Sequence, residues 1–194
     1  MPTTPGYPVQ LLLDGARVLV VGGGAVAARK AGGLSAAGAK ITVVAPAIAP
    51  EVEALPVRVE RRACRAGEAA GYRLVVTATD DPSVNARVAA DAEAANVFVN
   101  SADDPANCTF TLPAIARRGP VTVAVATDGS TPLLAQALRD RFAALLDDEV
   151  LALAADLAAL RSAIKTSGGS TEDFDWHARV SHDPRWRRLV ESVR

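Results

Sequence analysis

The chain has 194 residues, of which 49% are hydrophobic, 22% are charged and only 4% are aromatic, and its net charge at pH 7 is −1. A chain of this size and composition has room for one medium domain with a core of Ala, Val and Leu, with or without a small appendage. The near-zero charge leaves no basic footprint for nucleic acid or for an anionic membrane, so we expect neither as a partner.

The two cysteines and the N-terminal residues indicate in which cellular compartment the protein works. Cys64 and Cys108 stand far apart and in no C-x-x-C arrangement, which argues against a disulfide framework and a cysteine-based metal site. The N-terminal residues lack a basic stretch and are interrupted by Asp14 and Gly15, so they do not resemble a signal peptide. No run approaches the roughly 20 apolar residues of a membrane span. These features predict a cytoplasmic protein without a resident metal.

The first two thirds of the chain alternate predicted strands and helices. In chain order, the pattern predicts strands at residues 9–13 and 17–21, a helix at 25–37 ending at Gly38, strands at 41–44, near 57–60 and at 74–77, a helix at 84–95, and strands at 97–100 and 121–125. This alternation predicts a doubly wound α/β fold, with a parallel sheet covered by helices on both faces.

The last third is predicted to be helical. From Pro132 the sequence is almost continuously helix-forming up to Lys165. Within it an apolar stripe recurs at spacings of three and four, at Val150, Leu153, Leu157, Leu160 and Ile164. A loop at 166–173 precedes a predicted helical tail that runs to residue 194, with Trp176 and Trp186 as anchors. His177 and His182 lie in this tail without ligand-like spacing, which favours a surface role.

A glycine-rich turn joins the strand at 17–21 to the following helix. Gly22, Gly24 and Ala27 fit the pattern G-x-G-x-x-A. In the Rossmann-type dinucleotide site, the first glycine permits the tight turn, the second lets a pyrophosphate approach the backbone, and the third position lets the helix approach the sheet. The alternative is that the glycines serve only the packing of helix against strand.

The acid that normally reads the cofactor ribose is missing. It is expected about 20 residues further on, at the end of the second strand, where this chain has Val44, Ala45 and Pro46. Neither an acid for a 2′-hydroxyl nor an arginine for a 2′-phosphate stands there, so this rule leaves NAD and NADP open. Backbone groups around residues 45–47 are the alternative ribose contacts.

Three polar loops are further candidates. Thr79 and Asp80 follow a strand at the ligand-binding edge of the sheet, where Asp81 reads as a helix cap. After the next strand, Asp104 suits a helix cap before Pro105, which leaves Asp103 as a candidate acid or base.

The third loop lies in the last third of the chain. Gly129 and Ser130 lie before the helix that starts at Pro132, so their turn offers backbone N–H groups to an anion, unless Thr131 simply caps that helix.

Taken in order, several motifs resemble one family. They are YPVQLLLDGARVLVVGGGAVAARKA, ITVVAP, VVTATDDPSVN, FVNSADDPANCTFTLPA and GPVTVAVATDGSTPLLAQALRDRF. Over residues 7–145 the chain closely resembles the precorrin-2 dehydrogenase and sirohydrochlorin ferrochelatase family, the NAD-dependent module of siroheme synthase. Since no methyltransferase domain follows, we expect the free-standing form.

The resemblance implies a domain organisation and a cofactor. It implies an NAD-binding domain at residues 1–112, a small α/β dimerisation region at 113–146 and a helical C-terminal domain at 147–194, assembled as a homodimer. It puts cofactor contacts on Ala25 and Val26 and on Pro46 and Ala47, so the family itself does without the ribose-reading acid.

The resemblance also implies a substrate and a reaction, the NAD-dependent oxidation of precorrin-2 to sirohydrochlorin. Counting from Asn100, the family's essential aspartate falls on Asp103. Arg117, Arg118, Gly129 and Ser130 are candidate clamps for the substrate's carboxylates. The chain departs from the family at Asp128, where many members carry glycine.

Insertion of ferrous iron into sirohydrochlorin stays open. The alternatives are a member with chelatase activity alone and a non-catalytic module that senses NAD.

Overall fold

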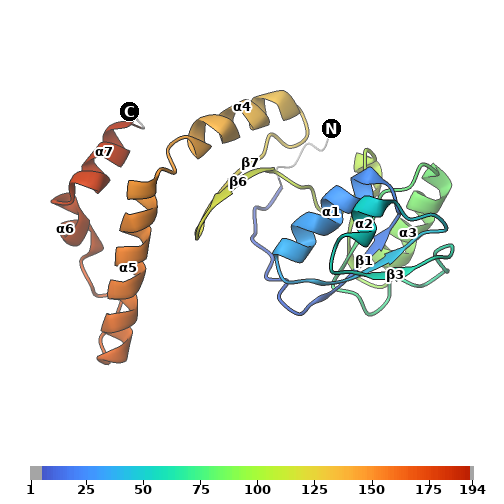
Figure 1. The fold of residues 1–194 in the computed structure, drawn as a ribbon, viewed down its shortest axis with the longest axis horizontal. Helices are drawn as coiled ribbons and strands as arrows, with labels where there is room; N and C mark the ends of the chain where they lie inside the picture. The colour runs from blue at the N-terminus through green and yellow to red at the C-terminus, as the bar shows by residue number, and fades with distance from the viewer. Residues whose placement is uncertain (1–5, 193–194) are drawn as a thin grey trace. The chain divides into compact units, whose positions relative to one another are not determined.

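The computed structural model describes residues 6–192 (Figure 1). The chain divides into two compact units, Gly6–Thr111 and a second unit that begins at Leu112. The three domain boundaries predicted from the sequence stay predictions, because this division does not separate a dimerisation region from a helical domain.

The first unit is built on a five-stranded parallel sheet. In spatial order its strands are β3 (Arg58–Glu60), β2 (Lys40–Val44), β1 (Arg17–Val21), β4 (Leu74–Thr77) and β5 (Phe98–Ser101). The helices are α1 (Ala25–Ala36), α2 (Pro50–Glu53), α3 (Pro82–Ala94) and the short 3₁₀ helix η1 (Pro105–Asn107). The strand order reverses between β1 and β4, and such a switch point is where open α/β sheets bind ligands. The predicted doubly wound fold is confirmed.

Alternate residues of the central strands face opposite layers. Val18 and Val20 point into a core shared with α1 and α2, whereas Leu19 and Val21 point into a core shared with α3. Ala27 of α1 is fully buried. A side chain this small lets the helix approach the strands closely, as the G-x-G-x-x-A pattern predicts.

The strand predicted at residues 9–13 is wrong. Residues 6–13 form no strand, and of them only Leu13 is buried. The reason is topological, because β1 pairs with β2 on one edge and with β4 on the other. No free edge of β1 is left for a hairpin partner. The predicted turn is present, since the N–H of Ala16 donates to the carbonyl of Leu13 at 2.9 Å.

The second unit begins with an antiparallel hairpin. Its strands are β6 (Ala114–Arg118) and β7 (Val121–Val125), and its helices are α4 (Pro132–Ala143), α5 (Asp148–Thr166), α6 (Trp176–Ser181) and α7 (Pro184–Ser192). α4 packs against both strands. β6 was not predicted, because its AIARR sequence lacks a clear alternation.

The continuous helix predicted from Pro132 is interrupted. Residues 144–147 separate α4 from α5, and the side chain of Asp147 caps α5 by accepting from the N–H of Val150 at 2.9 Å. In the predicted apolar stripe only Leu153 is buried, and the other four residues are partly exposed. The loop before the tail is confirmed, and the indole N–H of Trp176 donates to the carbonyl of Thr171 at 2.9 Å.

The predicted tail consists of two short helices, and its residues 193–194 lie outside the described part. Arg188 of α7 pairs with Asp147 at 3.1 Å and with Glu149, which ties α7 to α5. Between residues 6 and 192, none of the helices combines the length and the apolar character that crossing a bilayer requires.

Candidate cofactor and substrate site

Two of the three glycines after β1 are required by close packing. Gly22 has φ +123°, and a Cβ there would lie 2.2 Å from the carbonyl oxygen of Ala78. A Cβ on Gly23 would lie 2.0 Å from the carbonyl oxygen of Ala47. The glycine turn is therefore packed between the segments that follow β4 and β2.

Gly24 has no such packing role. Among the described residues, no atom lies within 4 Å of the position that a Cβ on Gly24 would take, and Gly24 is exposed. Its φ of −89° and ψ of −171° are extended values open to any residue. The interpretation that the glycines serve packing alone accounts for Gly22 but not for Gly24. A free approach to the backbone at Gly24 is what a bound pyrophosphate needs.

α1 begins directly after Gly24, and its N-terminus carries the partial positive charge of a helix dipole. Within residues 6–192 no side chain caps this helix, and its first turn contains Ala25, Val26 and Ala27 without an acidic residue. The first N–H groups of a helix lack partners inside the helix and attract anions. Ala25 and Val26 are thus placed to present backbone N–H groups to a phosphate, so these residues fit NAD(P).

The predicted contacts after β2 and β4 lie against the same turn. Pro46 and Ala47 are exposed, and the N–H of Ala49 donates to the carbonyl of Gly23 at 2.8 Å. This bond fixes the segment after β2 beside the glycines.

After β4, Thr79 is held to α3 by the side chain of Asn85, whose amide donates to the Thr79 carbonyl at 3.0 Å and accepts from its hydroxyl at 2.9 Å. Asp80 is exposed, and Asp81 caps α3 by accepting from the N–H groups of Ser83 at 2.8 Å and Val84 at 3.4 Å.

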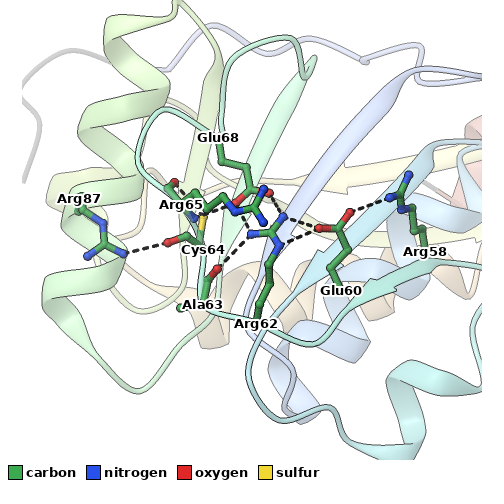
Figure 2. A network of polar contacts seen from close by, with 8 residues as sticks. All are labelled: Arg58, Glu60, Arg62, Ala63, Cys64, Arg65, Glu68 and Arg87. Atoms are coloured by element: carbon green, nitrogen blue, oxygen red, sulfur yellow. Dashed lines mark hydrogen bonds and ion pairs between the residues drawn. The ribbon is translucent and has the colours of Figure 1, made fainter.

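An acid does lie beside the end of β2, but it comes from the neighbouring strand. Glu60 ends β3 in register with Val44, and its carbonyl accepts from the N–H of Ala45 at 3.2 Å. Its carboxylate is already paired, with Arg58 at 3.0 Å and with Arg62 (Figure 2). Sequence reasoning missed Glu60 because the search for an acid followed β2 and not the strand beside it.

Arg62 bridges two carboxylates and organises the segment at residues 61–70. Figure 2 shows it between Glu60 and Glu68, which also accepts from the N–H of Arg65 at 2.8 Å. The hydrogen bond from Arg62 lowers the pKa of Glu68 to about 2. Burial, with Glu68 nearby, raises the pKa of the Cys64 thiol to about 11. Cys64 is therefore a protonated, unreactive thiol at neutral pH.

Asp103 follows β5 at the same edge of the sheet as the glycine turn. It is exposed and has φ +57°, a left-handed conformation that Asp and Asn tolerate better than most residues. Asp104 is half-buried, and its carboxylate accepts from the Asn107 amide at 2.6 Å and from the Ser101 hydroxyl at 3.4 Å.

The prediction that the Asp104 side chain caps a helix is wrong. Asp104 does precede η1, but in residues 6–192 no backbone N–H of that turn donates to its carboxylate. Pro105 has no N–H to offer, and the N–H of Asn107 donates to the Asp104 carbonyl at 3.2 Å instead.

The loop that carries Asp103 folds back along β5. The N–H of Val99 donates to the Thr109 hydroxyl at 2.8 Å, and the N–H of Ser101 donates to Cys108 Sγ at 3.1 Å. The amide of Asn100 donates to the carbonyl of Phe110 at 3.0 Å. Residues 108–110 thus cover the outer edge of β5, and Asp103 lies in the loop between β5 and this returning segment.

Lys30 and Asn100 are site residues that sequence reasoning missed. The ammonium of Lys30, on α1, donates to Oδ1 of Asn100 at 2.7 Å. Burial and the nearby Arg29 lower the pKa of Lys30, while Cys108 and Asp103 act in the opposite direction. The only signal in the sequence is a lysine on a helix of small residues, which did not reveal a partner 70 positions away.

The four candidate substrate clamps lie in the second unit. Arg117 donates to the Thr122 hydroxyl at 3.1 Å, and Arg118 binds the Leu146 carbonyl and pairs with Asp148 at 2.7 Å. Arg118 therefore connects β6 to α5, a structural contact that competes with a role as a clamp.

Gly129 and Ser130 lie in the turn between β7 and α4. The N–H groups of Ser130 and Thr131 already donate to the carbonyl and the hydroxyl of Thr127, at 2.8 and 3.3 Å. This leaves fewer N–H groups for an anion than expected. The alternative that the Thr131 side chain caps α4 is not observed either, because within the described residues this side chain accepts no N–H of α4. The left-handed Asp128 and Gly129 direct the turn instead.

Metal ligands do not gather in the described part of the chain. Over residues 6–192 there is no group of three or more His, Cys, Asp or Glu side chains that would hold an ion. His177 and His182 are both exposed, and Cys64 and Cys108 are free thiols.

The chain is similar to one part of the siroheme synthases of several bacteria. The siroheme synthase of Pseudomonas putida (strain W619) is 44% identical over 158 residues, 79% of this chain and 34% of that protein. The siroheme synthase of Tolumonas auensis is 43% identical over 188 residues, 95% of this chain and 40% of that protein. The chain thus spans about a third to two fifths of the length of these relatives.

A solved structure and a family model extend the match. The structure of SirC, precorrin-2 dehydrogenase, matches with a TM-score of 0.72 at 28% identity and covers 97% of this chain and 98% of SirC. Residues 9–114 match a family model described as putative NAD(P)-binding. The chain belongs to this putative NAD(P)-binding family.

Proposed function

We propose that this protein is a precorrin-2 dehydrogenase, which oxidises precorrin-2 to sirohydrochlorin with NAD⁺ in siroheme synthesis. The observation that carries the proposal is a single sheet edge with both halves of such a site: the open backbone at Gly24 after β1 and the exposed Asp103 after β5. The likeness to SirC over almost the whole chain supports the substrate.

The reaction removes two electrons and two protons from the substrate, as one hydride and one proton. Bound NAD⁺ supplies the hydride acceptor. Gly24 and the N-terminus of α1 hold the pyrophosphate, and Pro46, Ala47, Thr79 and Asp80 line the cofactor. Asp103 accepts the proton from the macrocycle or orients the macrocycle. Its loop is closed by hydrogen bonds along β5, which suits a residue that has to be positioned.

The proposal also includes the substrate clamps and a second activity. Arg117, with Gly129 and Ser130, remains proposed for the substrate's carboxylates, and Arg118 would first have to leave Asp148. Ferrous iron would be a second substrate, with Asp103 accepting pyrrole protons during insertion.

We also propose a homodimer in the cytoplasm. Four large apolar side chains of the predicted dimerisation region at residues 113–146 are exposed: Ile115, Leu133, Leu134 and Phe142. Exposed large apolar side chains are unfavourable in water, and an interface between subunits would bury them. The free thiols of Cys64 and Cys108 are consistent with a reducing compartment.

One coupled assay tests the function. The protein is mixed with NAD⁺ and precorrin-2 while NADH absorbance is followed, and ferrous iron is added once NADH formation stops. NADH formation supports the proposal. NAD⁺ binding without NADH formation would instead indicate a sensing module, and iron insertion into supplied sirohydrochlorin without NADH would indicate a chelatase alone.

A further inference from the structure

Lys30 makes a side-chain hydrogen bond to a residue 70 positions away in the sequence. It lies on α1, the helix that begins at the glycine turn, and is half-buried. Its ammonium reaches Oδ1 of Asn100 near the end of β5, at 2.7 Å. A charged amine loses hydration on burial, so a partly buried lysine is expected to keep a specific partner.

Both polar atoms of the Asn100 side-chain amide form hydrogen bonds. Asn100 is 6% exposed, its Oδ1 accepts from Lys30, and its Nδ2 donates to the carbonyl of Phe110 at 3.0 Å. An ammonium can only donate, and a carbonyl can only accept. The two partners therefore specify one orientation of the amide, with oxygen toward α1 and nitrogen toward the loop. Without Lys30, only the carbonyl of Phe110 would remain of these two partners to fix the orientation of the Asn100 amide.

The loop that Asn100 holds is the one that carries Asp103. Phe110 and Cys108 belong to its returning segment, and Nδ2 of Asn100 also lies 3.7 Å from Cys108 Sγ. Asp103 lies in this loop between β5 and η1, with φ +57°. A contact path thus runs from Lys30 through Asn100 to residues 108–110, and Cys108 Sγ donates to the carbonyl of Asp104, the residue after Asp103, at 3.4 Å.

We propose that Lys30 is a positioning residue for Asp103, acting through Asn100 and the loop at residues 101–110. The proposal rests on the proposed function of Asp103 in dehydrogenation. The titratable groups near Lys30 are Arg29 on its own helix, and Asp103 and Cys108 on the loop. Because burial and Arg29 lower its pKa, Lys30 loses its proton below the ordinary lysine value of 10.5. An arginine at this place would stay charged.

The test compares Lys30→Met, which keeps the apolar stem, with Lys30→Arg, which keeps charge and donor. Arg29→Met, an exposed neighbour, is the control. At pH 7 and saturating NAD⁺ we expect kcat of Lys30→Met to fall roughly 10- to 100-fold, as small misplacements do, with unchanged NAD⁺ affinity. Lys30→Arg should keep most of the rate and move the alkaline limb of its pH profile upward. Arg29→Met should keep the wild-type rate at pH 7.

A second readout does not depend on activity. Hydrogen exchange should become faster in the peptide that covers residues 101–110 of Lys30→Met, and not in Arg29→Met. Unchanged exchange there, a wild-type kcat in Lys30→Met or an unmoved alkaline limb in Lys30→Arg would each overturn the proposal. If the wild type forms no NADH from precorrin-2, the proposed function fails, and the exchange result still decides whether Lys30 holds the loop.

Discussion

The carbonyl oxygen of Ala78 approaches Gly22 so closely that a Cβ at Gly22 would lie 2.2 Å from it. At Gly24, two residues further on, a Cβ would meet no atom of the described residues within 4 Å. The packing of the fold thus requires glycine at position 22. At position 24 it does not, so the open backbone there is available to bind a ligand. This contrast separates the structural role of the turn from its binding role.

Gly24→Asp should abolish NAD⁺ binding without unfolding the protein. The extended backbone of Gly24 accepts Asp, which caps helices well, so the melting temperature should hold or rise. The new carboxylate would face the pyrophosphate, and like charges in contact cost several kcal/mol, so we expect affinity to fall by about 100-fold or more. Calorimetric titration with NAD⁺ and thermal unfolding measure the two effects.

Two further variants complete this comparison. Gly22→Ala should lose stability by at least about 2 kcal/mol, because it combines a clash with a positive φ. Gly33→Asp, on an open position of α1, adds the same charge away from the turn and should bind NAD⁺ normally. Normal affinity in Gly24→Asp would mean that the turn does not hold the cofactor.

Asp103→Asn should keep the fold and the NAD⁺ site but slow dehydrogenation. Asn adopts the left-handed backbone of this position readily, so the loop is preserved. The proton acceptor is lost, and a positioned acid or base contributes about 10²–10⁴-fold. Turnover at saturating NAD⁺, after melting temperatures have been compared, gives the measurement.

Asp104→Asn is the matched control. Its amide oxygen can still accept from Asn107, so the rate should change little. The assignment of Asp103 is wrong if Asp104 proves the more sensitive of the two, or if Asp103→Asn turns over at the wild-type rate.

The Arg62–Glu68 pair should make stability depend on pH in the acid range. The pKa of Glu68 is lowered from 4.5 to about 2 in the folded protein. Its stabilisation is therefore fully present above pH 4.5 and is lost as the pH falls toward 2. Glu68→Gln should lower the melting temperature at pH 7, and this difference should shrink as the pH is lowered through that window. Glu93→Gln, on the exposed side of α3, is the control, and its melting temperature should differ little from that of the wild type at either pH. If the difference in melting temperature between Glu68→Gln and the wild type stayed constant over this pH range, the proposed dependence on Glu68 would be wrong.

The protein should be a dimer at micromolar concentration, as measured by light scattering. Leu133 is 78% exposed on α4, in the predicted dimerisation region, so Leu133→Glu should shift the population toward monomer. Leu12→Glu alters a leucine that is 87% exposed in the first unit and should leave the dimer intact. A monomeric wild type, or equal effects of the two variants, would contradict the proposed interface.

Local sequence patterns determined most elements of the first unit. β1 (Arg17–Val21) and β4 (Leu74–Thr77) match their predicted ranges, and α1 ends at Ala36, two residues before the left-handed Gly38. Periodicity and glycine placement report burial and backbone conformation, which depend on a few neighbouring residues. For the same reason the sequence was sufficient to single out Gly24 and Asp103.

Only the tertiary structure decided which strand edges and which distant side chains meet. Residues 9–13 have the composition of a strand, but both edges of β1 are occupied by β2 and β4. Glu60 reaches the end of β2 from β3, and Lys30 finds Asn100 across 70 residues. These pairings depend on strand order and packing, which no local window of sequence contains, because the free energy of each contact arises only once the chain has folded.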